Sequence, residues 1–338
     1  MLQLSYSPYT LQLLHPFTIA TNTRNTTPIV LVQIKYENFI GYGEASMPPY
    51  LGESHESVLR FLAKVNLAKY DLPFDLASIL TDIDKIENGN TAAKAAIDIA
   101  LHDLVGKVLN RPWYKIIEAA PEKMPETSMT IGIDSIEVIK KKVAEANDFK
   151  VLKIKLGHEN DKKIIEAIRE VTDKPVCVDV NQGWSNKEFA LDMIHWLNEK
   201  NVLFIEQPLP KEMLEETTWL STRSPLPIIA DEAVQRISDI EKIKDAYHGI
   251  NIKLMKCTGM REAHQMIQKA RQLKLKVLIG CMNESSCANL AAAQLAPLAD
   301  WVDLDGPFMI SNNPFKTPEL KHGKIVLSAL PGIGLELK

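Results

Sequence analysis

Short apolar runs alternate with helical segments through the second two-thirds of the chain. The runs that we interpret as strands are Thr127–Ile133, Leu152–Leu156, Val176–Val180, Leu203–Glu206, Ile228–Asp231, Ile250–Leu254, Val277–Cys281 and Trp301–Leu304. Between them, apolar residues recur on one helical face, as Ile136, Ile139 and Val143 do in SIEVIKKKVAEA. Runs such as VCVDV and VLFI are continuously apolar, which is typical of parallel strands covered on both faces. We therefore expect an α/β fold in which parallel strands and helices close into a modified TIM (β/α) barrel.

The first third of the chain follows a different pattern. LQLLHPFTI, PIVLVQIKY and FIGYGEA favour strands, whereas the segment from about 55 to 118 is rich in helix formers at helical spacing. The final segment, KIVLSALPGIGLELK, reads as a hairpin or tail that returns to this first unit. We expect an N-terminal α+β capping domain over 1–122, completed by the C-terminal tail 319–338, and a catalytic barrel domain over 123–318.

Charged side chains stand where five successive apolar runs end. They are Lys153 and Lys155 in LKIK, Asp179 in VCVDVN, Glu206 in VLFIEQP, Asp231 in PIIADE and Lys253 in GINIK. From Lys155 onward they are 22 to 27 residues apart, the length of one strand, one helix and two short loops. Because the ends of parallel barrel strands meet at one mouth, we expect these side chains to converge there.

Three of these charged residues are acids on consecutive strands. Neighbouring parallel strands lie about 4.8 Å apart, so Asp179, Glu206 and Asp231 can surround one ion. Oxygen ligands without His or Cys favour Mg²⁺ over zinc. For a single acid, a helix cap or a surface ion pair would explain the charge as well. Three acids at matching positions instead predict one Mg²⁺ per subunit.

The lysines suggest proton transfer. Lys153 and Lys155 are two residues apart, so both point to the same face of a strand, and a confined like-charge pair lowers the pKa of at least one of them. Lys253 ends a strand four positions around the barrel, across the mouth. One lysine can remove a proton from the carbon beside a metal-bound carboxylate, through an enediolate, and the other can return it on the opposite face. The alternative is that the lysines form a solvated polar edge.

Composition adds mainly exclusions. The chain has 338 residues and a net charge of −4, which gives no indication of a nucleic-acid or membrane partner. No apolar run approaches the ~18–20 residues of a membrane span, and the N-terminus does not read as a signal peptide. The four cysteines form no CxxC pair, so a cytoplasmic location with reduced thiols is expected. The sequence leaves open whether the protein is a homo-oligomer.

Several motifs resemble the enolase superfamily, in its muconate-lactonising subgroup. They are KIK, DVNQGW, IEQP, ADE and NIKLMKCTGM, together with AAIDIALHDLVGK near the start and PGIGLEL at the end. The resemblance implies a capping domain built from both termini and a modified barrel. It also implies Asp179, Glu206 and Asp231 as metal ligands, with acid/base roles for Lys155 and Lys253.

The eighth expected strand distinguishes activities within this subgroup. WVDLDGP carries Asp303 and Asp305 in alternation, so both carboxylates reach the inner face, where they suit an ammonium group. A dipeptide supplies that group and succinylbenzoate lacks it. Dipeptide epimerases carry this D-x-D, and GCMNES, with Met282 and Asn283, also resembles theirs. The alternative is that the two acids form a helix cap or support other site residues.

The resemblance therefore predicts a Mg²⁺-dependent dipeptide epimerase that inverts the C-terminal residue of an Ala-X dipeptide, with Lys153 supporting the substrate carboxylate. Other enzymes of the subgroup are the alternatives: o-succinylbenzoate synthase, N-acylamino acid racemase and cycloisomerase. A non-catalytic binding protein is a further alternative, which the intact lysines and ligands disfavour.

The identity of X rests on loop residues. Arg24 either pairs with a glutamate side chain or has a structural role, and Thr130 either touches substrate or packs. A neutral pocket is expected from the side chains of Ile19, Met47, Leu51 and Met282. Such a lining favours small or hydrophobic X, including D-Ala-D-Ala-like peptides from cell-wall turnover.

Overall fold

The structure is a computed structural model that describes residues 1–19, 22–71 and 73–338; the side chains of Ile19 and Asn22 lie outside this description. The N-terminal part forms what we call the capping unit. It contains the antiparallel strands β1 (Gln3–Ile19), β2 (Asn22–Tyr36) and β3 (Phe39–Ser46), and the helices α1 (His55–Leu62), α2 (Leu76–Asp84), α3 (Thr91–Val108) and α4 (Trp113–Ile116). Helix α3 is buried almost all round, including its polar side chains Lys94, Asp98, His102 and Asp103.

Two glycines explain how tightly this unit packs. Gly41 and Gly43 lie on β3, where a Cβ atom would collide with the α3 backbone at Ala100 and Ala96. Only a residue without a side chain lets the strand and the helix approach so closely. The GYGE segment is thus a packing device between β3 and α3.

The rest of the chain forms the barrel. Within the described residues, its eight strands run in sequence order around one parallel sheet. They are β4 (Ser128–Ile131), β5 (Val151–Lys155), β6 (Val176–Asp179), β7 (Val202–Glu206), β8 (Ile228–Ala230), β9 (Gly249–Ile252), β10 (Lys276–Gly280) and β11 (Trp301–Asp303). A bridge between Thr127 and Val302 and a hydrogen bond from Leu304 N to Thr127 Oγ1 (2.9 Å) join the first and last strands. The predicted eight-stranded barrel is therefore confirmed.

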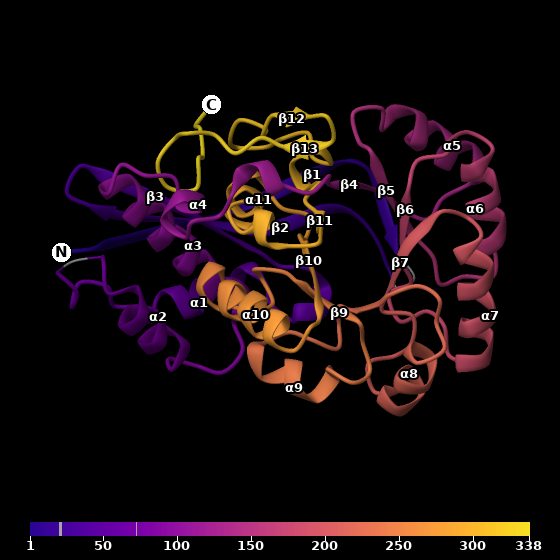
Figure 1. Cartoon of the computed structure of the whole chain (residues 1–338). Helices are drawn as coiled ribbons and strands as arrows, with labels where there is room; N and C mark the ends of the chain where they lie inside the picture. Colours follow the sequence, from indigo (N-terminus) through magenta and orange to yellow (C-terminus); the bar gives the residue numbers. More distant parts are fainter. Residues whose placement is uncertain (20–21, 72) are drawn as a thin grey trace.

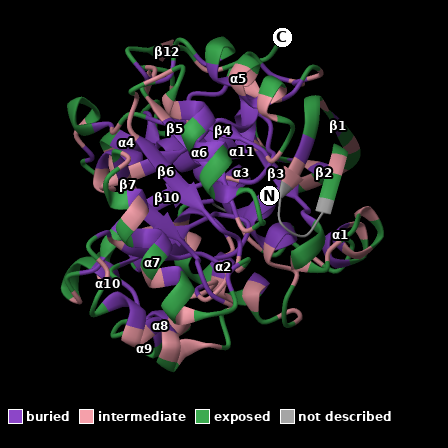
Figure 2. Cartoon of the chain, turned by 90° about the vertical axis from the view of Figure 1, so that its right-hand side faces the viewer, coloured by how far each residue is buried: buried purple, intermediate pink, exposed green. Residues whose placement is uncertain are grey.

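Helices cover the outside of the barrel. They are α5 (Ile136–Glu145), α6 (Asp161–Arg169), α7 (Lys187–Asn198), α8 (Leu214–Ser221), α9 (Ile240–Ile243), α10 (Met260–Gln272) and α11 (Ser286–Ala293). Figure 1 shows α5, α6 and α7 along one side of the molecule and α1 and α2 of the capping unit on the other. Buried residues gather in the central strands, and exposed residues lie on the outward faces of the helices (Figure 2). No helix among the described residues is long and apolar enough to cross a membrane.

The C-terminal segment runs back to the capping unit after the short hairpin β12 (Leu320–Lys321) and β13 (Lys324–Ile325). Trp113 N donates to Gly332 O at 2.8 Å, and Ile333 N donates to the buried Asp103 carboxylate at 3.0 Å. The end of the chain thus packs on α3 and α4 (Figure 1).

Two carboxylates of the capping unit hold helices of the barrel. Glu44 on β3 accepts hydrogen bonds from the Ser285 hydroxyl and from Ser285 N (2.9 Å), at the start of α11. Asp98 on α3 accepts from Met260 N and Arg261 N, in the first turn of α10. The first N–H groups of a helix lack partners within the helix and favour negative charge. Each acid therefore completes a helix that belongs to the other unit.

Candidate active site and metal centre

A cavity of about 410 Å³ lies where the barrel strands end, beneath the tips of the capping strands and the 3₁₀ turn η1 (Pro49–Leu51). It is lined by Phe17, Arg24, Pro49, Tyr50, Thr130, Lys153, Lys155, Asn181, Gln182, Asp231, Glu232, Lys253, Cys281, Met282, Asn283, Asp303, Asp305 and Met309. The position agrees with the general rule that the sites of such barrels lie at the carboxyl ends of the strands.

Three buried carboxylates meet beside the cavity, and of these Asp231 is among the described residues that line it. Asp179 and Glu206 are directly paired in the β6–β7 ladder, and Asp231 follows β8 by one residue. Ligand oxygens of the three lie within 4.8 Å of one another. Glu206 Oε2 is ion-paired with the Lys153 ammonium at 2.8 Å and has no other donor within the described part of the chain. Such an all-oxygen donor set fits Mg²⁺.

Neighbouring amides orient two of these carboxylates. Asn251 Nδ2 donates to Glu206 Oε1 at 2.7 Å, and Asn181 N donates to Asp179 Oδ1 at 3.0 Å. One oxygen of each carboxylate is thereby fixed by the protein. The other oxygen, Oε2 of Glu206 or Oδ2 of Asp179, is turned toward the lysines that surround the triad.

Lys153 is the centre of the charge network. Its ammonium lies 3.0 Å from Asp179 and 2.8 Å from both Glu206 and Asp303. Burial alone would lower the pKa of Lys153, but the surrounding carboxylates outweigh burial and raise it well above its usual value. The expected lowering by a neighbouring lysine is therefore not found at Lys153, because the acids on other strands dominate its field.

Lys155 and Lys253 flank the triad. Lys155 Nζ lies 2.6 Å from Asp179 Oδ2, and Lys253 Nζ lies 2.8 Å from Asp231 Oδ2. Burial alone would lower the pKa of Lys253. Asp231 and Tyr50 outweigh burial and raise this pKa well above its usual value. Strands β5 and β9 are four apart in the ring, so the two lysines approach from opposite sides. A Mg²⁺ ion at the triad would take over from these lysines as counter-charge to the carboxylates.

The D-x-D acids lie beside the triad. Asp303 Oδ1 accepts from Ser128 Oγ at 2.8 Å while its Oδ2 pairs with Lys153, so both oxygens are engaged. Asp305 Oδ2 accepts from Thr130 N at 2.6 Å, and among the described residues the one hydrogen-bond partner of its Oδ1 is the Cys281 thiol, at 3.8 Å. Burial, and then the nearby Asp303, raise the pKa of Asp305 to about 6. Asp305 Oδ1 is thus the least satisfied acceptor of the pair.

The capping unit supplies the outer wall. The Arg24 guanidinium stacks over Phe17 at 5.5 Å from the ring centroid, and Arg24 Nε has no partner among the described residues. Burial lowers the pKa of Arg24. Tyr50 Oη contacts Met282 Sδ at 3.2 Å. A guanidinium drawn out of water without an acid beside it is a natural receptor for a carboxylate.

Most of the sequence-predicted positions meet at this cavity. Thr130, Met282 and Asn283 line it with Arg24 and the D-x-D acids. Met47 is instead buried in the core and Leu51 packs against that core, and neither is among the described lining residues. The expected neutral lining is wrong at these two positions, because the irregular turn at η1 presents Tyr50 to the cavity.

Other lining residues were missed by sequence reasoning. Glu232 follows a metal ligand directly, and burial together with Asp231 and Asp179 raises its pKa to about 7. Its position in ADE was the available signal. Met309 and Gln182 also line the cavity, but they lie in irregular loops where no period indicates which way a side chain points.

A parallel barrel that gathers three carboxylates and three lysines beneath a capping unit defines a metal-dependent enzyme of the enolase type. Residues 137–338 match the model described as enolase C-terminal domain-like. Residues 7–117 match the N-terminal domain of mandelate racemase / muconate lactonizing enzyme. The chain belongs to this family.

Individual relatives are similar over nearly their full length. The L-Ala-D/L-Glu epimerase of Bacteroides thetaiotaomicron is 55% identical over 335 residues, which are 99% of this chain and 88% of the relative. The N-succinyl Arg/Lys racemase of Bacillus cereus superposes with a TM-score of 0.92 and 29% identity, covering 99% of this chain and 95% of that one. The dipeptide epimerase of Enterococcus faecalis, complexed with Mg and L-Leu-L-Tyr, has a TM-score of 0.90, 31% identity and 99% coverage of both chains. With the triad geometry, these likenesses identify Asp179, Glu206 and Asp231 as a magnesium site.

Proposed function

We propose that the protein is a Mg²⁺-dependent dipeptide epimerase that inverts the α-carbon of the C-terminal residue of Ala-X, with X including glutamate. The observation that carries the proposal is the placement of Lys155 and Lys253 on opposite sides of the triad. A carbon held between them has one lysine on each face, which is what a 1,1-proton transfer requires.

The residues divide the chemistry between them. Asp179, Glu206 and Asp231 would hold Mg²⁺, which supplies positive charge beside the substrate carboxylate and so acidifies the α-hydrogen. One of Lys155 and Lys253 removes the α-proton as the neutral amine, and the other, as the ammonium, donates a proton to the opposite face. Lys153, whose pKa is raised, stays protonated and stabilises the charge that develops on the carboxylate oxygens.

The D-x-D acids select the N-terminal ammonium. Asp305 Oδ1 is available to accept a hydrogen bond, and Asp303 adds a second negative charge beside it. When the substrate ammonium displaces water from this place, it pairs with the two acids. In the low dielectric of the cavity that pairing is strong, and neither acid is left buried without a partner. The same acids disfavour an N-succinyl or succinylbenzoate group, which brings negative charge rather than positive charge to this place.

Arg24 favours glutamate as X. It contributes to the outer wall a guanidinium whose Nε has no partner among the described residues, and the relative from Bacteroides thetaiotaomicron is an L-Ala-D/L-Glu epimerase. A charged X pocket thus replaces the neutral one expected from the sequence. Arg24 lines the cavity, whereas Met47 and Leu51 are not among the described residues that line it. We propose that the enzyme acts in the cytoplasm on dipeptides from cell-wall turnover.

The decisive experiment follows the α-hydrogen directly. The purified protein is incubated with Mg²⁺ and L-Ala-L-Glu in D₂O, and proton NMR and chiral chromatography follow the glutamate residue. We expect loss of the glutamate α-proton signal together with formation of L-Ala-D-Glu. N-succinyl amino acids and succinylbenzoate precursors serve as matched substrates for the alternatives. Absence of α-hydrogen exchange with every member of an Ala-X panel would overturn the proposal.

A further inference from the structure

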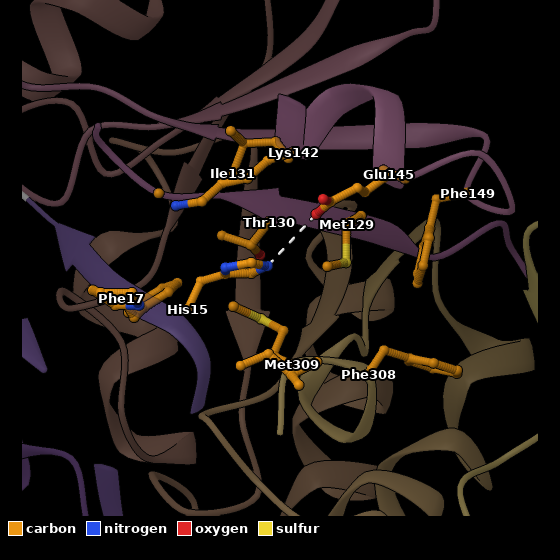
Figure 3. Close-up of a pocket in the computed structure, with 14 residues that line it drawn as sticks. His15, Phe17, Met129, Thr130, Ile131, Lys142, Glu145, Phe149, Phe308 and Met309 are labelled. Atoms are coloured by element: carbon orange, nitrogen blue, oxygen red, sulfur yellow. Dashed lines mark ion pairs between the residues drawn. The ribbon is translucent and has the colours of Figure 1, made fainter. Parts of the chain in front are cut away.

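A second pocket lies next to the substrate cavity and has no role in the proposed reaction. Its volume is about 220 Å³. It is lined by Leu14, His15, Pro16, Phe17, Met129, Thr130, Ile131, Gly132, Lys142, Glu145, Ala146, Phe149, Phe308 and Met309. We call it the side pocket. Figure 3 shows Phe17 on one side of it and Phe149 and Phe308 on the other, with Thr130 and Met309 between them.

The side pocket is largely apolar. Phe149 and Phe308 pack edge to face, with ring centroids 5.5 Å apart. The main polar feature is the pair between His15 Nε2 and Glu145 Oε2, 3.5 Å apart and drawn as a dashed line in Figure 3. These two side chains are about half exposed, at 52% and 48%, so the pocket opens to solvent there. Its lining suits an aliphatic or aromatic side chain.

Three residues separate the side pocket from the substrate cavity. Phe17, Thr130 and Met309 line both spaces. Thr130 also donates its N–H to Asp305, one of the acids that would hold the substrate ammonium. The shared wall therefore stands next to the place of the N-terminal residue, at the opposite end of the dipeptide from the α-carbon that the lysines serve.

We propose that Met309 limits the size of the N-terminal residue, and that the side pocket is a subsite for the side chain of that residue which Met309 separates from the substrate cavity. This inference rests on the proposed function. With Met309 in place, the wall admits the methyl group of alanine. With a shorter side chain at 309, the N-terminal side chain extends into the side pocket while its ammonium keeps its contacts with Asp303 and Asp305.

Met309 is the member of the wall that can be shortened without disturbing its neighbours. Phe17 is buried and carries the Arg24 guanidinium on its ring, and Thr130 holds Asp305 through its backbone. Met309 contributes its backbone carbonyl to Leu14 N at 2.9 Å, and that bond survives truncation of the side chain. Its unbranched thioether fills the gap by shape alone.

The test compares two substrates that differ only at the N-terminal residue. The ratio of kcat/KM for L-Leu-L-Glu to that for L-Ala-L-Glu is measured for the wild type, Met309→Ala and the milder Met309→Val. We expect a low ratio in the wild type and a rise of at least tenfold in Met309→Ala, since the larger apolar side chain of leucine is then buried in the side pocket. Met309→Val gives a smaller rise, and it remains informative when the alanine variant folds poorly.

Met129→Ala is the matched control. Met129 lines the side pocket but is not among the described residues that line the substrate cavity, so its truncation enlarges the pocket without opening the wall. We expect its ratio to match that of the wild type. An unchanged ratio in both Met309 variants, an equal rise in Met129→Ala, or a wild type that already prefers L-Leu-L-Glu overturns the inference. A wild type that does not epimerise L-Ala-L-Glu overturns the proposed function instead.

Discussion

Replacement of Arg24 by methionine tests how the protein reads the C-terminal residue of its substrate. Methionine keeps the length of the aliphatic part, and so preserves its packing over Phe17, but it removes the guanidinium. In the free protein that guanidinium is drawn from water, and its Nε is unpartnered within the described chain. The substitution therefore leaves no buried acid of the protein unpaired, and the effect on stability should be small.

The effect on catalysis should depend on the charge of X. A hydrogen bond to a charged group contributes about 1.5–3 kcal/mol. Arg24→Met should therefore lower kcat/KM for L-Ala-L-Glu by roughly 10- to 100-fold, since about 1.4 kcal/mol corresponds to a factor of ten. L-Ala-L-Met, which has a similar shape and no charge, should change by less than about threefold or improve, because no desolvated cation then faces its thioether.

The assay is epimerisation of the two dipeptides under the same saturating Mg²⁺, followed by chiral chromatography. Arg24→Lys is the control that keeps the charge but loses the planar fork, and it should fall between the wild type and Arg24→Met with L-Ala-L-Glu. An equal loss with both substrates would mean that Arg24 has a structural role. No loss with L-Ala-L-Glu would mean that the glutamate carboxylate binds elsewhere.

Three further predictions concern the triad and its neighbours. Lys155→Met and Lys253→Met should each abolish epimerisation. NMR in D₂O can still show exchange of the α-hydrogen of one stereoisomer, because a base on one face suffices for exchange. Epimerisation at the wild-type rate in either variant contradicts the two-base mechanism. Because the pKa of Asp305 is raised to about 6, with Asp303 and Cys281 as its neighbours, its carboxylate is ionised above this pH and neutral below it. The KM for the dipeptide should therefore rise as pH falls through 6, and Asp305→Asn should have a high KM that is flat over this range; a wild-type KM independent of pH between 5 and 7 argues against the ammonium contact. EDTA should abolish activity, and Mg²⁺ at 100 times its Kd should raise the free energy of unfolding by about 2.7 kcal/mol. The melting temperature of Asp231→Asn should not depend on Mg²⁺. A Mg²⁺-dependent rise in that temperature as large as in the wild type would contradict Asp231 as a ligand.

The barrel was predictable because its strands are continuously apolar and evenly spaced. That spacing placed Asp179 and Glu206 side by side, and the structure pairs them directly across β6 and β7. Strand ends differ from the prediction by a residue or two. Asp231 and Lys253, for example, lie just beyond β8 and β9, because the final hydrogen bonds depend on the following loop.

The environment of Lys153 was not predictable in the same way. From the sequence its nearest charge is Lys155, and the expectation is a lowered pKa for at least one of these two lysines. In the folded barrel, closure of β11 onto β4 brings Asp303 within 2.8 Å of the Lys153 ammonium. A contact across 150 residues of sequence cannot be read from local pattern, and with the larger effect of Asp179 it raises the pKa of Lys153.

Which side chains of the outer wall face the cavity was also not predictable from the sequence, even between adjacent residues. Tyr50 and Leu51 are neighbours in η1, yet only Tyr50 of the two is among the described residues that line the cavity. Strands and regular helices have a period that tells which residues share a face. A single 3₁₀ turn next to two prolines has none, so the residues of this wall had to be placed by the structure.

The contacts of Glu44 and Asp98 bear on how the two units can be separated. Each acid is buried and completes the first turn of a barrel helix from outside, so a barrel produced without the capping unit would expose free N–H groups at α10 and α11. The capping unit alone would in turn leave Glu44 without its Ser285 donors, and Asp98 would keep the His102 ring at 3.2 Å but lose the N–H groups of Met260 and Arg261. Unfolding in denaturant should accordingly be a single transition, and chimaeras that exchange capping units between relatives should fold only when these two acids and their helix starts are carried over together.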